Sequence, residues 1–295
     1  MDNNIKKSQK KAEFSEWFAK QKKELIKNFN IVKQLVKRNV KVQYRNSAIG
    51  VVWTILNPLL NMLVMFLVFS SFFAPSGNER NTYALYLLCG NIVFGMLRGA
   101  TVQSLPSLVY NRGLLTKNKM SFNVFPLSCN LSALVNFAFS FIALFVVMVV
   151  VWFGFGVGNV FSPNIFLTLV MLPALFLFTY GLSLLLSALY VFFRDIMHFY
   201  TVFLTLWTYL TPIFYTTDKF AGAGTFGKIM LTVIKLNPMY HFVEYFRDVA
   251  YRCAVTGAPL PTFGDTMLLY VIGLAAVLVG AIVFLSTKRR FIFNI

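Results

Sequence analysis

Two long stretches of this chain contain no charged residue. One extends from Asn46 to Asn78 and the other from Met120 to Phe193. About 20 apolar residues are enough to cross the hydrocarbon core of a bilayer as a helix. The second stretch is too long for one crossing and is interrupted by a glycine-containing segment, 153–164. Because a polypeptide chain spans lipid only as helices or a closed barrel, this pattern predicts an all-α integral membrane protein.

The apolar runs predict six transmembrane helices with both termini in the cytosol. A cytosolic N-terminal segment, residues 1–48, precedes a six-span transmembrane domain, residues 49–295. The expected spans cover residues 49–73, 82–104, 127–152, 165–190, 197–215 and 266–286. Pro173 is expected to bend the fourth span.

The charge distribution sets the orientation and excludes nucleic acid as a partner. The formal net charge is +17, and 20 of the 27 Lys and Arg residues fall in segments that this topology places inside the cell. That excess matches the positive-inside bias and attraction to anionic lipid. Cys89, Cys129 and Cys253 lack the spacing of metal ligands and are interpreted as apolar packing residues.

The N-terminal segment predicts an amphipathic helix at the membrane surface. Its apolar face is formed by Phe14, Trp17, Phe18 and Leu25, and lysines occupy the other positions. Aromatic residues opposite lysines are typical of helices that lie in the interface. The alternative is a solvated helix that packs on a partner protein.

Residues 217–263 are expected outside the cell, and part of this segment should re-enter the outer leaflet. Pro238 can begin a helix, and apolar residues then recur at helical spacing as far as Cys253. Such a helix is about 24 Å long, too short and too charged to cross the membrane. A shorter helix over 226–236 is expected to pair with it.

Three residue patterns could indicate ligand chemistry. Gly222–Lys228 has the glycine and lysine spacing of a phosphate-binding loop, but Ile229 replaces the required Ser or Thr, so a surface turn is favoured. His241, Glu244 and Asp248 could be metal ligands on one helical face, although a hydrated face is the simpler interpretation. We therefore expect no metal site and no catalytic residues.

Arg98 lies inside the second expected span. A charge within a span usually faces the bundle interior or a water-filled path, where a guanidinium group could bind a phosphate of an anionic substrate. The alternative is that its long side chain reaches the head groups.

Several motifs resemble those of type-2 ABC exporter permeases, in the branch that exports polysaccharides, O-antigens and teichoic acids. The matching residues are Lys41, Tyr44, Arg45, Ser47, Gly50, Trp53, Pro58, Arg194, Asp195, Asn237, Pro238 and Arg247. The loop between the second and third expected spans resembles the family's first cytosolic loop. There the resemblance implies a coupling helix, over about 109–117, that docks on an ATPase. Its expected contact residues are Asn111, Arg112, Gly113, Leu114, Leu115 and Lys117, with Leu115 as the apolar anchor.

The resemblance implies a homodimer with two copies of an ABC ATP-binding subunit in the bacterial cytoplasmic membrane. ATP and magnesium would be bound by that partner, so no cofactor is expected in this chain. The substrate would be a lipid-linked glycan polymer that passes along the dimer interface. A type-2 exporter of drugs or lipids, or less well supported a membrane-embedded transferase, remains as an alternative.

Overall fold

The computed structural model describes residues 26–43, 50–73, 77–117, 120–158, 160–217, 220 and 224–294, and these are helical without any strand. Residues 26–43 form the first described helix. The elements that follow are η1 (Gly50–Val52), α2 (Trp53–Phe73), η2 (Gly77–Thr82), α3 (Tyr83–Ser104), α4 (Ser107–Tyr110), α5 (Arg112–Lys117), α6 (Val124–Phe155), η3 (Pro163–Leu167), α7 (Thr168–Phe192), α8 (Ile196–Leu210), α10 (Gly224–Leu236), α11 (Pro238–Arg247), the π-helical turn η4 (Asp248–Arg252), α12 (Cys253–Thr256) and α13 (Phe263–Asn294).

Five helices in the described part of the chain are long and apolar enough to cross a membrane. They cover Trp53–Phe72, Arg80–Ser104, Val124–Phe155, Pro163–Phe192 and Phe263–Lys288. These match five of the six expected spans to within a few residues, so the chain is a multi-pass helical membrane protein. Pro173 lies inside α7, which remains one continuous helix.

The fifth expected span, 197–215, is shorter in the structure. Helix α8 has 15 residues and ends at Leu210, which gives a rise of about 23 Å. Thr211 adopts an extended conformation immediately before Pro212, as the steric restriction on a residue before proline favours. Hydropathy alone extended this span because Pro212–Tyr215 are mostly apolar.

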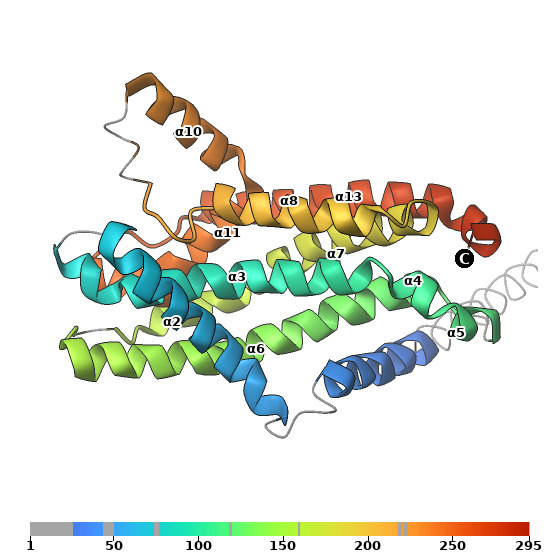
Figure 1. Cartoon of the computed structure of the whole chain (residues 1–295), viewed down its shortest axis with the longest axis horizontal. Helices are drawn as coiled ribbons and strands as arrows, with labels where there is room; N and C mark the ends of the chain where they lie inside the picture. Colours follow the sequence, from blue (N-terminus) through green and yellow to red (C-terminus); the bar gives the residue numbers. More distant parts are fainter. Residues whose placement is uncertain are drawn as a thin grey trace, which may run out of the picture.

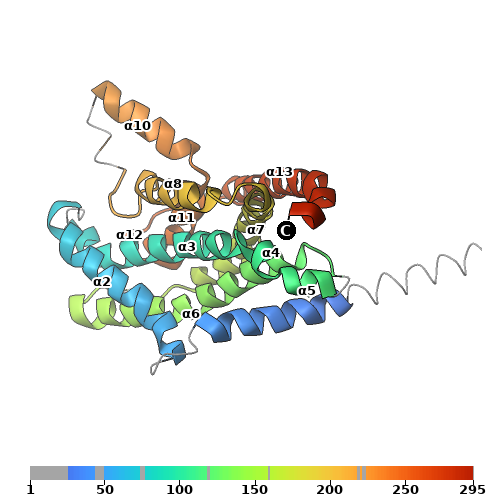
Figure 2. The ribbon, with the colours of Figure 1, turned by 45° about the vertical axis from the view of Figure 1, so that its right-hand side comes forward.

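Helix α3 forms the centre of the bundle. It is the most buried of the five long helices, and α2 is the least buried. Figure 1 shows α2 crossing the bundle obliquely, whereas α3, α6, α7 and α13 extend along its long axis. After the rotation in Figure 2, α10 still projects away from the other helices.

Helices α7 and α13 pack backbone to backbone because glycines line their contact. A Cβ atom at Gly181 would collide with the backbone of Ala276, and one at Gly280 would collide with the carbonyl group of Gly181. At Gly273 a Cβ atom would lie 2.7 Å from the Ala174 carbonyl oxygen. Small residues allow this close approach, which strengthens packing between helices in lipid.

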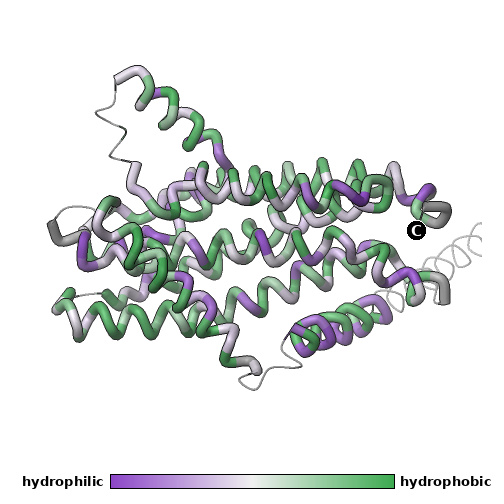
Figure 3. Tube along the Cα trace, in the orientation of Figure 1, coloured by the Kyte–Doolittle hydropathy of each residue, from purple (hydrophilic) through white to green (hydrophobic). Residues whose placement is uncertain are grey.

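One end of the molecule carries α4, α5 and the C-terminal end of α13, and the opposite end carries α10, α11 and α12 (Figure 1). A second apolar cluster lies at the α4–α5 end, and there the helix of residues 26–43 packs through Val32 and Leu35. Figure 3 shows hydrophilic and hydrophobic stripes along this helix. The expected interface residues Phe14, Trp17, Phe18 and Leu25 lie outside the described residues.

One further expectation needs correction. The single coupling helix expected over 109–117 is divided into α4 and α5 at Asn111, which adopts a non-helical conformation. After the last expected span, α13 continues as a helix to Asn294. No proline or glycine follows Gly280 to interrupt the helix.

Candidate functional site

Helix α11 begins at a polar junction formed by Asn237 and Pro238. The Asn237 side-chain oxygen accepts hydrogen bonds from the Met239 backbone N–H at 3.0 Å and from Trp207 Nε1 at 2.7 Å. Its amide nitrogen donates to Thr211 Oγ1 at 2.8 Å. An asparagine N-cap followed by proline at the first helical position is a favoured helix start. This junction therefore fixes α11 to the end of α8.

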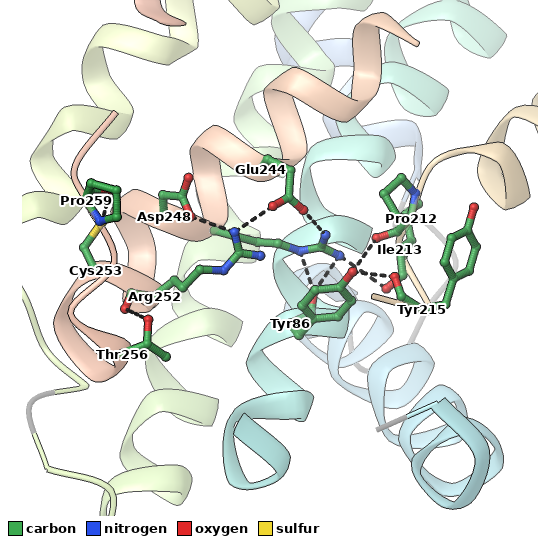
Figure 4. A network of polar contacts seen from close by, with 11 residues as sticks. Tyr86, Pro212, Ile213, Tyr215, Glu244, Asp248, Arg252, Cys253, Thr256 and Pro259 are labelled. Atoms are coloured by element: carbon green, nitrogen blue, oxygen red, sulfur yellow. Dashed lines mark hydrogen bonds and ion pairs between the residues drawn. The ribbon is translucent and has the colours of Figure 1, made fainter. Parts of the chain in front are cut away.

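The guanidinium group of Arg247 is completely buried at the other end of α11. It donates to the carbonyl oxygens of Tyr86 and Ile213 at 3.2–3.3 Å and forms an ion pair with Glu244 at 2.7 Å. It also lies 3.4 Å from the centroid of the Tyr86 ring. Figure 4 shows these contacts converging from α3, the segment after α8, and α11. This single side chain links three segments that are distant in sequence.

Arg252 extends the network by pairing with Glu244 at 2.6 Å and with Asp248 at 2.8 Å. Burial would raise the pKa of the Glu244 carboxyl, but Arg247 and Arg252 together hold it below its ordinary value. Burial raises the pKa of Asp248, whose principal cationic neighbour is Arg252. Both carboxylates, considered above as metal ligands or as part of a hydrated face, thus bind arginines. We call Glu244, Arg247, Asp248 and Arg252 the arginine network.

Two tyrosines of α3 hold the segment after α8 against this network. Tyr83 donates to the Phe214 carbonyl oxygen at 2.6 Å, and Tyr86 donates to those of Pro212 and Tyr215. Gly90 lies beside them, where a Cβ atom would be 3.0 Å from Arg247 Nη2. A larger residue there would press against the buried guanidinium group.

At the opposite end of the molecule, Asn111 connects the α4–α5 junction to the helix of residues 26–43. Its side-chain oxygen accepts a hydrogen bond from Arg38 Nη2 at 3.0 Å, and its amide nitrogen donates to the Ser107 carbonyl oxygen at 2.7 Å. Leu108 of α4 lies in the same apolar cluster as Val32 and Leu35. The junction and the basic helix are therefore in direct contact.

The expected coupling residues do not all face outward. Leu114 is 37% exposed and Tyr110 is 74% exposed, whereas Leu115 is half-buried and packs on the chain's own apolar cluster. Arg112 and Gly113 are exposed. Lys117 ends α5. Leu115 thus contributes to the packing of this chain, and Leu114 is the more exposed of the two leucines.

Arg98 lines a cavity of about 760 Å³ between α3, α4, α6 and the helix of residues 26–43. Its guanidinium group donates to Thr208 Oγ1 of α8 at 3.2 Å. Arg38 lines the same cavity. Arg38 lies on the helix of residues 26–43 and Arg98 lies on α3. The sequence pattern did not indicate that these two arginines would line one cavity.

The remaining sequence motifs are spread over the molecule. Gly50 has a positive φ of 57°, which other residues rarely adopt, and Trp53 and Pro58 lie in the first two turns of α2. Arg194 and Asp195 are exposed between α7 and α8. Tyr44, Arg45 and residues 222–223 of the P-loop-like run lie outside the described residues. Its remaining part begins α10, on which Lys228 is exposed.

The arrangement of apolar spans, a basic helix and short helices at one end agrees with the comparison to known proteins. The family model described as "ABC-2 type transporter" matches residues 31–251. The chain belongs to the ABC-2 type transporter family. It is 25% identical over 263 residues to the O-antigen export system permease protein RfbA of Klebsiella pneumoniae, covering 89% of this chain and 94% of that protein. It is 27% identical over 269 residues to RfbA of Myxococcus xanthus, covering 91% and 96%.

Sequence reasoning about this ABC-2 permease identified Asn237, Pro238 and Arg247 but missed their partners. Trp207 and Tyr86 lie in apolar segments, where an aromatic residue is ordinary. The only available signal was their polar atoms, since a buried indole N–H or phenol group normally needs a hydrogen-bond partner. The partners became identifiable only when the helices were placed together.

Proposed function

We propose that this chain is the permease subunit of an ATP-driven exporter that moves a lipid-linked polysaccharide across the bacterial cytoplasmic membrane. The observation that carries the proposal is the ABC-2 match over residues 31–251, together with relatives named as O-antigen export permeases that align over nearly their full lengths. The family leaves ATP hydrolysis to a partner, so ATP and magnesium belong on a separate ATP-binding subunit.

The proposed topology has six crossings with both termini in the cytosol. Helix α8 would complete the fifth crossing together with the segment after it, which Tyr83 and Tyr86 hold against α3. Helices α10 and α11 would then lie on the external side as re-entrant elements. In support, Arg112 lies in α5, Arg194 between α7 and α8, and Lys288 near the C-terminal end of α13. Figure 1 shows these segments at the end of the bundle that carries α4 and α5, where the positive-inside bias requires basic residues.

We infer that α4 and α5 receive the movement of the ATPase. The exposed Tyr110 and Leu114 supply apolar anchors, and such anchors dominate the affinity of most protein interfaces. The Arg38–Asn111 hydrogen bond and the apolar cluster that contains Leu108, Val32 and Leu35 then link α4 to the basic helix. A displacement of α4 would therefore move the helix of residues 26–43 as well.

The substrate path is proposed to lie between two copies of this chain. Helix α2 supports this arrangement, because large apolar side chains such as Leu63, Leu67 and Phe72 are exposed on it. In a bilayer such a surface faces either lipid or a second subunit. Two copies of the permease and two ATP-binding subunits form the proposed assembly.

The function is tested by deletion and complementation in the source bacterium. Loss of this chain should abolish surface display of one glycan, with its lipid-linked precursor accumulating inside the cell. The purified permease should hydrolyse ATP only when it is co-purified with its ATP-binding partner. An unchanged surface glycan, together with increased sensitivity to small hydrophobic compounds, would instead favour a drug exporter.

The topology is tested by cysteine labelling in a background without Cys89, Cys129 and Cys253. A cysteine at Lys228 should react with an impermeant reagent from outside intact cells, and one at Tyr110 only after the membrane is opened. The opposite accessibility would reverse the proposed orientation and remove α4 and α5 as the coupling elements.

A further inference from the structure

We propose that the cavity lined by Arg38 and Arg98 binds the glycosyl phosphate head group of the lipid-linked substrate. The proposal rests on the proposed function and adds a specific site to it. The cavity measures about 760 Å³, within the range of small-molecule sites. It is large enough for a sugar with one or two phosphate groups.

The charge of the cavity lining favours an anion. Arg38 and Arg98 are the two cationic residues that line it, and no lining residue is acidic. Within the described part of the chain, both guanidinium groups donate to neutral oxygens, those of Asn111, Asn39 and Thr208, and neither forms an ion pair. Each guanidinium group has five N–H donors, so donors remain for phosphate oxygens. Bonds from arginine to phosphate are charge-assisted and stronger than bonds between neutral groups.

The rest of the lining favours a sugar beside the phosphate. Five amide side chains contribute to the same cavity, those of Asn39, Gln43, Gln103, Asn111 and Asn136. Asn136 donates to Gln43 Oε1 at 3.1 Å, while its own buried Oδ1 has no hydrogen-bond partner among the described residues. Amide side chains both donate and accept hydrogen bonds. Sugar hydroxyls do the same, whereas an ionised phosphate group only accepts.

The position of the cavity also fits a substrate that arrives in the inner leaflet. Arg98 lies six residues before the end of α3, about 9 Å along the helix axis. Pro106, Ser107 and Asn111, at and after that end, also line the cavity. In the proposed topology this is the cytosolic level of the membrane, where the phosphate of a membrane-anchored sugar resides. Arg38 also contacts Asn111 at the α4–α5 junction, so the site borders the proposed coupling elements.

Binding can be measured with the permease–ATPase complex in neutral phosphatidylcholine nanodiscs. The probes are a fluorescent short-chain polyprenyl diphosphate that carries one hexose and the same lipid without the hexose. Arg98→Ala and Arg38→Ala should each weaken binding of both probes at least tenfold. Arg98→Lys should weaken probe binding less than Arg98→Ala, because the positive charge is kept although the planar guanidinium group is lost. Asn136→Leu should weaken binding of the hexose probe about fivefold and leave the sugarless probe unchanged.

Two controls separate ligand binding from structural damage. Thr208→Val removes the hydrogen-bond acceptor of Arg98 but keeps the guanidinium group. Arg80→Ala removes an exposed arginine from η2, which precedes the other end of α3. Both should bind the probes like the wild type, and the thermal stability of every variant is measured in parallel.

Unchanged binding by Arg38→Ala and Arg98→Ala would overturn the proposal. So would displacement of the hexose probe by phosphatidylglycerol as effectively as by unlabelled probe, since the cavity would then be a site for lipid head groups. In cells, normal export by the Arg38→Ala/Arg98→Ala variant, in a strain where deletion abolishes export, would refute this site alone. Unchanged glycan display after deletion would refute the proposed function itself.

Discussion

The arginine network predicts that Glu244→Gln is far more damaging than Asp248→Asn, although both changes remove one charge with little change in shape. Glu244 is the only ion-pair partner of the fully buried Arg247 within the described residues. In the same part of the chain, Asp248 forms an ion pair only with Arg252, which keeps Glu244 as a second partner. Removing Glu244 leaves a buried guanidinium group without a counter-charge, whereas removing Asp248 does not.

The magnitudes follow from burial. Breaking a fully buried ion pair by removing one partner costs about 3–5 kcal/mol. The Glu244 side chain is 22% exposed, so solvent reduces the penalty and we expect roughly 2–3 kcal/mol. The Asp248 and Arg252 side chains are each 25% exposed, and their pair should contribute about 1 kcal/mol or less. The two variants should therefore differ clearly.

The pH dependence provides a second signature. Because Arg247 and Arg252 hold the pKa of Glu244 below its ordinary value, its stabilising contribution is complete above about pH 4.3, the ordinary value for glutamate. The contribution is lost as the pH falls through the lower pKa of the folded state. The difference in stability between wild type and Glu244→Gln should therefore be constant near neutrality and shrink in strong acid.

Thermal unfolding of the purified permease in detergent, followed by tryptophan emission, measures both effects. Glu244→Gln should lower the melting temperature by several degrees more than Asp248→Asn at pH 7. Equal losses for the two variants, or a difference that persists unchanged in acid, would show that Glu244 does not stabilise the buried Arg247 side chain that links α11 to α3.

Three further predictions concern other parts of the chain. Leu114→Asp should reduce export and co-purification of the ATPase while the permease still inserts, because this side chain is exposed. Leu115→Asp should instead lower the amount of folded permease on immunoblots. If both variants behave alike, the two leucines do not differ in role. Gly280→Leu should cost at least about 1–3 kcal/mol by forcing α7 and α13 apart, whereas Gly95→Leu, which has open space around its Cβ position, should melt like the wild type. Asn237→Ala should lower the stability of the folded permease by about 0.5–2 kcal/mol because the helix cap is lost. It should also shift the tryptophan emission, since Trp207 loses its hydrogen-bond acceptor. Asn237→Asp keeps the acceptor oxygen, so its stability and emission should change less.

The chain's local chemistry determined its class and most of its helices. No charged residue occurs from Asn46 to Asn78 or from Met120 to Phe193. Such segments must be buried in lipid or in protein, whichever helices pack beside them. Asn237 and Pro238 likewise specify the start of α11, because a cap and a fixed φ act within one helical turn. These features depend on residues close in sequence and could be predicted without a structure.

Tertiary structure decided which polar groups meet. Arg247 binds the carbonyl oxygen of Tyr86, 161 positions away, and Arg38 reaches Asn111 across 73 positions. Helix periodicity marks an apolar face, but it does not show which arginine on α11 will be enclosed, nor that Leu115 turns inward while Leu114 is exposed. Burial and electrostatic partnership depend on atoms contributed by other helices. The sequence therefore specified a helical membrane protein, and the packing of its helices decided where its charges could be stabilised and where a cavity for an anion remained.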